Sequence, residues 1–171
     1  MPKSETALIV GAGLGLSASL ARRFSSEGVK VALASRNIEK LDNLVAETNA
    51  KAYTCDATDP AAVEELFSDV TDEFSQPDIV IYNASNRVRG PITDIDPEAV
   101  LTAIKITCYG GFLVAQQAAK QMVQRGNGAI FFTGASAGVK GYPNSATFAM
   151  GKFGLRGLAQ SMARELHPQN I

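Results

Sequence analysis

One stretch, from Ala7 to Phe24, limits what this chain can fold into more than any other part of it. Its first four residues, Ala7 to Val10, are apolar and predict a short buried strand. Three glycines then occupy alternate positions: Gly11, Gly13 and Gly15. The residues that follow have helical spacing, and we expect one face to carry Leu16, Leu20 and Phe24. The stretch therefore predicts a strand that turns through glycines directly into a helix.

A strand–glycine–helix turn has a physical use. Glycine lets another group approach bare backbone, and the start of a helix offers unpaired N–H groups and a positive dipole end that attract phosphate. Counted from Gly13, the positions of Gly13, Gly15 and Ala18 fit the relaxed dinucleotide-binding pattern G-x-G-x-x-A. The alternative interpretation is a tight strand–helix turn that binds no ligand.

Strands and helices alternate along the rest of the chain. Short apolar runs predict strands at 29–34, 50–55, 78–82 and 129–133. Helical patterns cover 38–48, a segment that begins at Pro60, a region from 96 to 124 interrupted at Gly110–Gly111, and 146–166. In a chain of 171 residues this alternation predicts one α/β domain over residues 1–171. The expected architecture is a Rossmann-type doubly wound parallel sheet in three αβα layers.

In such sheets, ligands bind beyond the carboxyl ends of the strands, where the strand order reverses. Glycine or polar residues follow all five predicted strands, at Gly11–Gly15, Ser35–Arg36, Asp56, Asn83 and Thr133–Ser136. Because the carboxyl ends of parallel strands meet at one edge of the sheet, we expect these residues to line a common cleft.

The end of the second strand distinguishes between nucleotide cofactors. NAD sites usually place a carboxylate there for the ribose 2′-hydroxyl, whereas this chain has Ser35 and then Arg36. An arginine can pair with a 2′-phosphate through a charge-assisted fork, so we expect NADP(H) in preference to NAD(H), which stays possible. Asp56 could accept a hydrogen bond from adenine or serve as a turn residue. Asn83 and Ala84 could approach the adenosine ribose or simply form a turn.

Composition narrows the class of partner. The net charge is −1 and the basic residues are spread along the chain, which argues against nucleic acid. Cys55 and Cys108 have neither metal-site nor redox spacing, so we expect two reduced packing residues and no metal. The first strand starts too early for a signal peptide. We also expect no apolar run long enough to span a membrane, and hence a cytoplasmic protein.

Several short motifs resemble those of the short-chain dehydrogenase/reductases. They are VGAGLGLS at 10–17, SRN at 35–37, CDATD at 55–59, YNAS at 82–85, GYP at 141–143 and FAMGKFGL at 148–155. The resemblance covers nearly the whole chain and implies the Rossmann fold, a nicotinamide cofactor and a small carbonyl or alcohol substrate. The residues expected to bind the cofactor are Gly11, Gly13, Leu14, Gly15, Leu16, Ser35, Arg36, Asn37, Asp56, Ala57, Asn83, Ala84, Ser85 and Lys152.

The same resemblance makes the catalytic positions unusual. Lys152 stands where the family has the lysine that binds the nicotinamide ribose. Phe148, Ala135 and Thr107 occupy the positions of the family's tyrosine proton donor, its serine and its asparagine. A phenyl ring has no proton to give, and losing a positioned general acid typically lowers a rate about 10²–10⁴-fold. Two rescues are conceivable: Tyr142 could swing in from its loop, or Ser136 or Thr133, assisted by water, could hold the substrate oxygen.

Further departures from the family pattern concern glycines and length. Ser17 and Ser85 stand where the family usually has glycine, and the chain stops before the family's last strands. In relatives, the helices that correspond to the long fourth helix and the last helix form a four-helix interface, which implies a homodimer or homotetramer.

Three functions fit the sequence. The first is an NADP(H)-dependent oxidoreductase for a carbonyl/alcohol pair with an atypical active site. The second is a non-catalytic NADP(H)-binding sensor or scaffold protein, suggested by Phe148 and Ala135. The third is a methyltransferase-like domain, which Ser35 argues against because such a site usually has an acid there.

Overall fold

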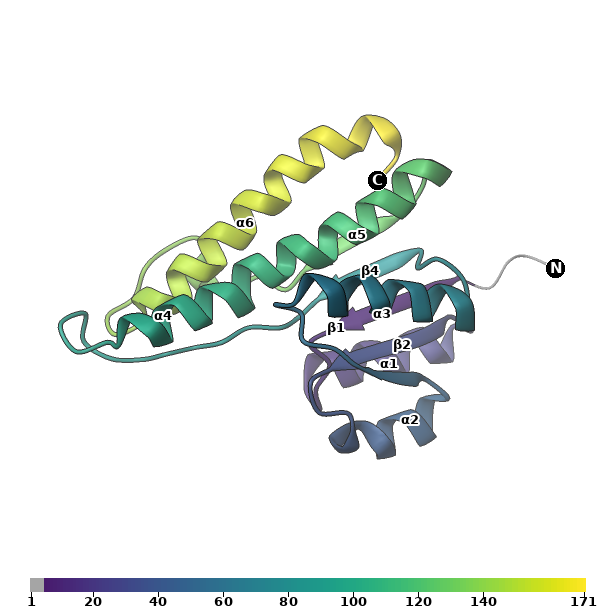
Figure 1. Cartoon of the computed structure of the whole chain (residues 1–171), viewed down its shortest axis with the longest axis horizontal. Coiled ribbons are helices and arrows are strands. Elements are labelled where there is room, and N and C mark those ends of the chain that lie inside the picture. Colours follow the sequence, from purple (N-terminus) through teal and green to yellow (C-terminus); the bar gives the residue numbers. More distant parts are fainter. Residues whose placement is uncertain (1–4) are drawn as a thin grey trace.

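Five parallel strands form a single sheet in the part of the chain that the structure describes, residues 5–171, in the order β3-β2-β1-β4-β5 (Figure 1). This structure is a computed structural model. The strands are β1 (Thr6–Val10), β2 (Lys30–Ser35), β3 (Lys51–Thr54), β4 (Ile79–Tyr82) and β5 (Ala129–Phe132). Each lies within one residue of its predicted bounds. The doubly wound parallel sheet predicted from the alternating pattern is therefore confirmed.

The strand order reverses next to β1. The chain passes from β1 outward to β2 and β3, returns to the other side of β1 as β4, and continues to β5. In register, Val10 lies beside Ala34 of β2 and beside Tyr82 of β4. The carboxyl ends of β1 and β4 thus form the point at which open α/β sheets bind ligands.

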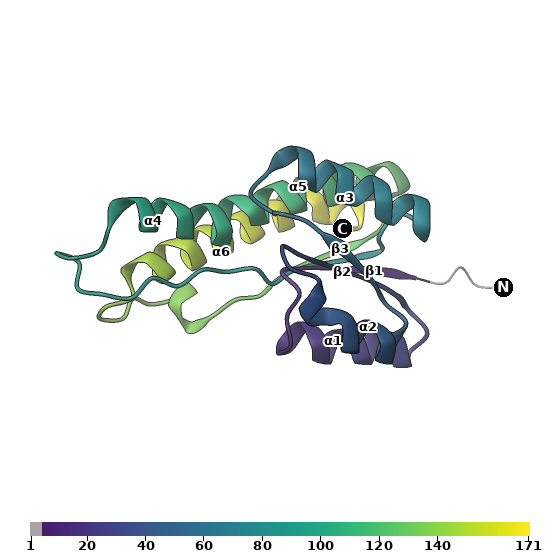
Figure 2. The same ribbon diagram turned by 60° about the horizontal axis from the view of Figure 1, so that its bottom comes forward.

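Helices cover both faces of the sheet (Figure 2). The helices α1 (Leu16–Ser26) and α2 (Asp42–Thr48), the latter preceded by a short 3₁₀ turn (Glu39–Leu41), lie on one face. On the other face are α3 (Pro60–Glu73), α5 (Gly110–Arg125) and α6 (Ala146–Leu166), with α4 (Pro97–Ile104) leading into α5. The α3 start follows its sequence signal, because Asp59 Oδ1 accepts a hydrogen bond from the Ala61 N–H and Pro60 occupies the first turn.

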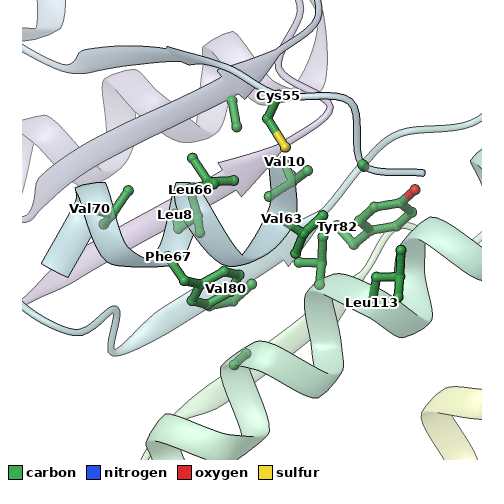
Figure 3. Packing of buried hydrophobic residues seen from close by; sticks show 14 of the residues in the cluster. Leu8, Val10, Cys55, Val63, Leu66, Phe67, Val70, Val80, Tyr82 and Leu113 are labelled. Carbon is green, nitrogen blue, oxygen red and sulfur yellow. The ribbon is translucent and has the colours of Figure 1, made fainter. Parts of the chain in front are cut away.

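The larger core lies between the sheet and the helices α3 and α5 (Figure 3). One face of α3 is apolar and buried: Val63, Leu66, Phe67 and Val70 pack in one cluster with strand residues such as Leu8. Cys55 belongs to the same cluster, and both it and Cys108 are unpaired, as expected of packing cysteines.

The apolar face predicted for α1 packs on the sheet only in part. Leu16 is 51% exposed, whereas the buried residues of this helix are Ser17, Ala18 and Ala21. Small side chains let α1 lie close to the sheet, and the larger Leu20 and Phe24 pack at its margins. Hydrophobic periodicity marks the helix face that carries the largest apolar side chains. The contact between α1 and the sheet is too close for large side chains, so small ones occupy it.

The predicted interruption at Gly110–Gly111 is also wrong. One continuous helical segment runs from α4 through a π-helical turn (Lys105–Tyr109, η2) into α5. Gly110 is needed for close packing, because a Cβ there would lie 2.5 Å from Tyr82 Oη and 2.8 Å from Ala57 O. Because Gly110 has no side chain, the helix can pass close to the end of the sheet, and the helix continues through this position.

This segment, Pro97–Arg125, is long and apolar enough to cross a membrane by length and composition, so the expectation that no run qualifies is corrected. Its inward side belongs to the sheet core, where Val114, Ala118 and Met122 are buried. Core helices of α/β domains share this composition, because one face must be apolar to cover the sheet.

Candidate functional site

A cleft of about 610 Å³ opens at the carboxyl ends of β1 to β4. The structure brings most of the predicted cofactor residues to its walls: Gly11, Gly13, Ser35, Arg36, Asn37, Asp56, Ala57, Asn83, Ala84 and Ser85. Leu14, Gly15 and Leu16 follow directly in the turn into α1 but do not line the cleft. The sequence interpretation missed Lys40, Thr58 and Ile106, which also line it. Of these, Lys40 had a signal, as a second cation four residues after Arg36.

Gly11 has a strict structural requirement. Its φ of +83° lies in the left-handed region, and a Cβ there would lie 2.3 Å from the backbone nitrogen of Ala84. Its N–H and that of Ala12 both donate to the Ala34 carbonyl, at 3.0 and 2.9 Å. Gly11 therefore holds the turn between the ends of β2 and β4, and any side chain would push these strands apart.

Gly13 and Gly15 differ from Gly11. Neither has a positive φ, and a Cβ at either position would meet nothing within 4 Å. Packing within the protein therefore does not explain these glycines. They leave backbone open at the start of α1, where a phosphate could approach, and this space fits the pyrophosphate of a dinucleotide.

Ser17, a departure from the family's glycine, links the turn to β4. Its side chain is fully buried, and its hydroxyl donates to Gly11 O at 3.4 Å. The Asn83 amide donates to the same hydroxyl, Nδ2 to Oγ, at 2.8 Å. One face of the Asn83 side chain is thus occupied in holding the glycine turn, a role that the sequence interpretation did not assign.

Arg36 and Asp56 face the cleft from the ends of β2 and β3. Asp56 Oδ1 accepts hydrogen bonds from the N–H and the hydroxyl of Thr58, each at 2.9 Å. These bonds, the Thr58 N–H first, and the charge of Arg36 lower the pKa of the Asp56 carboxyl. Asp56 is therefore a turn residue, the alternative that the sequence left open, and its adenine contact stays a prediction. Arg36 is exposed, with its charge available to a ligand.

Lys152 lies apart from this cleft, at the end of β5. Its side chain on α6 is buried to 4% exposure, and Nζ donates to the Thr133 carbonyl at 2.7 Å. Burial lowers the pKa of its ammonium group. The Nζ also lies 5.8 Å from the centroid of the Phe148 ring, one helical turn earlier. Among the described residues its hydrogen-bond partner is the Thr133 carbonyl, which leaves two of the three ammonium N–H donors for a ligand.

Thr107 sits in the π-helical turn and is buried. Its hydroxyl accepts a hydrogen bond from the Asn86 N–H at 3.0 Å and faces the Asn86 carbonyl at 3.4 Å. Helix α6 packs closely on it, because a Cβ at Gly151 would lie 2.8 Å from Thr107 Cβ. Thr107 therefore contacts both the loop after β4 and helix α6. Short π-helical turns are frequent at functional sites.

The remaining catalytic candidates lie in the loop between β5 and α6. Ala135 is extended, and the exposed Ser136 opens a 3₁₀ turn (Ser136–Gly138). The Tyr142 ring is 40% exposed and has Lys140 Nζ 5.1 Å from its centroid. Within residues 5–171, neither Ser136 nor Tyr142 hydrogen-bonds to Lys152. The structure therefore places Lys152 beside Phe148, and no hydrogen bond among the described residues links either hydroxyl to Lys152.

Comparisons with known proteins agree with this geometry. The family model "short chain dehydrogenase" matches residues 5–171. Among curated proteins, the 3-oxoacyl-[acyl-carrier-protein] reductase MabA of Mycobacterium avium is 30% identical over 168 residues, which are 98% of this chain and 64% of that protein. The chain thus spans slightly less than two thirds of that relative.

Solved structures give a closer match in shape. The crystal structure of a short-chain dehydrogenase from Rhodopseudomonas palustris has a TM-score of 0.93 and 35% identity, and the match covers 99% of this chain and 82% of that one. An actinorhodin polyketide ketoreductase with NADPH has a TM-score of 0.92 and 28% identity, covering 95% and 65% of the two chains.

Proposed function

Because this chain belongs to the short-chain dehydrogenase family, we propose that it is an NADP(H)-dependent oxidoreductase that acts on a carbonyl/alcohol pair with an atypical active site. One arrangement carries the proposal: a cleft at the reversal of strand order, with Arg36 at one end and the buried cation of Lys152 beyond the other. The solved ketoreductase with NADPH supports the choice of cofactor.

The residues present fit a phosphorylated dinucleotide. The open space at Gly13 and Gly15 suits the pyrophosphate, and the cations Arg36 and Lys40 suit a 2′-phosphate. We propose that Lys152 gives its two free N–H donors to the hydroxyls of the nicotinamide ribose. When bound, the nicotinamide supplies a hydride that is transferred to or from the substrate carbon.

The atypical part is proton transfer. Phe148 has no hydroxyl, so a substrate oxygen in this site takes its proton from water, at a rate below that of a positioned phenol. Placement of the substrate beside the cofactor still lowers the barrier, because the cleft and not the phenol determines that placement. We therefore propose slow carbonyl reduction.

Phe148 and Ala135 favour a second candidate, a non-catalytic NADP(H)-binding sensor or scaffold. Calorimetric titration with NADPH, followed by NADPH oxidation assays with a panel of aldehydes, ketones and quinones, separates the two. NADPH binding with turnover of any panel member supports the enzyme and removes the scaffold. Binding without turnover leaves the scaffold, and absence of binding refutes both.

Arg36 gives a direct test of cofactor choice. We expect Arg36→Ala to weaken NADPH binding by about 10- to 100-fold, because a hydrogen-bonded charge pair contributes about 1.5–3 kcal/mol. NADH lacks the 2′-phosphate, so its affinity is expected to change less than threefold, about 0.6 kcal/mol. Titration of both nucleotides checks this. Equal losses for NADPH and NADH would show that Arg36 does not read the 2′-phosphate.

We also propose a cytoplasmic homodimer or homotetramer. Exposed aromatic and apolar side chains lie along the two long helical segments, namely Tyr109, Phe112, Met150 and Phe153. The Tyr109 and Phe112 rings stack on each other, 6.3 Å between centroids, next to solvent. Such patches on neighbouring helices mark interaction surfaces. Light scattering at micromolar concentration should give at least twice the mass of 18.0 kDa, and a monomer refutes the interface.

A further inference from the structure

The Phe148 ring has two cations beside it. The Arg87 guanidinium carbon lies 5.0 Å from the ring centroid, and Lys152 Nζ lies 5.8 Å from it. Within residues 5–171, the ion pairs closer than 4.0 Å involve Arg22, Arg23, Lys51 and Arg125. Two positive charges therefore stand at the proposed reaction centre without a carboxylate from the described chain to neutralise them.

The backbone next to Arg87 is held in place. Asn86, its neighbour in the loop after β4, exchanges hydrogen bonds with the buried Thr107 hydroxyl. The close contact of Gly151 with Thr107 fixes α6, which carries Phe148 and Lys152, against the same point. Arg87, Phe148 and Lys152 thus come from two segments that one buried contact joins. The packing consequently holds the backbone that carries Arg87 close to the segment that carries Phe148.

The chemistry of this arrangement favours an anion. A guanidinium on an aromatic face is held by a cation–π interaction and still presents its N–H fork at the edge. Arg87 is exposed and donates no side-chain hydrogen bond within the described residues, so this fork is open to a ligand. Ala135 and Phe148 provide no neutral donor for an uncharged substrate. A carboxylate fills an arginine fork with two parallel hydrogen bonds.

We propose that Arg87 is a specificity-determining residue that binds a substrate carboxylate, so that the substrate is an oxo acid or its hydroxy acid. This inference rests on the proposed oxidoreductase function of the same site. The carboxylate itself is unchanged in the reaction. The carbonyl carbon gains the hydride, the carbonyl oxygen gains a proton from water, and NADPH is oxidised to NADP⁺.

The test compares acids with their own neutral esters. The NADP⁺-loaded full chain is titrated by ligand-observed NMR with pyruvate, acetoacetate and levulinate, and with the methyl ester of each. We expect at least one acid to bind about 10-fold more tightly than its ester. Arg87→Gln should lower the affinity for that acid by about 10- to 100-fold and leave the ester within twofold. Arg87→Lys, which keeps the charge but loses the fork, should lie between the two.

Arg89→Gln is the matched control. Arg89 is an exposed cation two residues along the same loop, and the cation–π partners of the Phe148 ring among the described residues are Arg87 and Lys152. Its replacement should leave all six affinities within twofold of those of the unaltered chain. The inference is overturned if every acid binds no better than its ester, or if Arg89→Gln lowers acid affinity as much as Arg87→Gln. NADPH titration reports separately on the proposed function, since Arg87 does not line the nucleotide cleft.

Discussion

Replacing Phe148 by tyrosine and Ala135 by serine in one chain is expected to raise the rate of carbonyl reduction by about 10²–10⁴-fold. The tyrosine supplies the proton that the phenyl ring lacks, and a positioned general acid contributes about that much. The serine adds a donor for the substrate oxygen in the loop after β5. Steady-state kcat with any substrate that the unaltered chain reduces is the measurement.

The surroundings of Phe148 are suited to a phenol. Lys152 Nζ lies 5.8 Å from the ring centroid and is already held by the Thr133 carbonyl. A nearby ammonium stabilises a phenolate, so it would lower the pKa of the new hydroxyl toward the working pH. In the unaltered chain the Phe148 ring carries no hydroxyl, so Lys152 has no phenol pKa to lower.

Lys152 provides the control for this gain. Adding Lys152→Met to the double variant should remove most of the increase, because the phenol then keeps its ordinary high pKa. If the double variant folds and binds NADPH but reduces substrate no faster than the unaltered chain, the proposed geometry of the reaction centre is wrong. If the protein is a scaffold, the unaltered chain has no reductase activity, and activity is expected only in the double variant.

The second large effect separates two glycines that the sequence pattern treats alike. Gly13→Asp is expected to leave the unfolding temperature unchanged and to weaken NADPH binding at least about 100-fold, since a carboxylate placed against phosphate is repelled by several kcal/mol. Gly11→Ala is expected to destabilise the fold by about 2–4 kcal/mol, because its Cβ would collide with backbone and its φ is left-handed.

Thermal unfolding and calorimetric titration measure both results. Gly141→Asp is the control for Gly13→Asp, because Gly141 also has no neighbour within 4 Å of a built Cβ but does not line the cleft. It should bind NADPH normally. Normal binding by Gly13→Asp as well would place the phosphates elsewhere, and an unfolding temperature of Gly11→Ala equal to that of the unaltered chain would contradict the packing account of Gly11.

Local features of the sequence were sufficient for the fold. Strand and helix periods depend on residues a few positions apart, so the five strands and the start of α3 at Asp59–Pro60 could be located from the chain alone. The position of the cleft could be predicted as well, because the carboxyl ends of parallel strands meet at one edge of the sheet. Arg36 and Asp56 each follow a predicted strand directly, so their place in the cleft followed from their positions in the chain.

The close contacts between distant segments could not be predicted in this way. Which side of α1 faces the sheet depends on how closely the helix can approach, and small Ala18 and Ala21 allow a contact that Leu16 would prevent. Gly110 looked like a helix break, but it is the point at which a continuous helix meets Tyr82. Hydrophobic periodicity shows which residues share a face, but it does not show how closely two packed elements approach each other.

Some features of the candidate site could likewise be predicted from the sequence, and others appear only in the tertiary structure. The sequence by itself determined which residues follow the strands into the cleft, and it placed Lys152 one helical turn after Phe148. Only the tertiary structure joined Asn83 to Ser17, 66 residues away, and Asn86 to Thr107, 21 residues away. It alone brought Arg87 to Phe148. The Asn86–Thr107 and Arg87–Phe148 pairings depend on how α6 packs against the π-helical turn, which no single segment encodes.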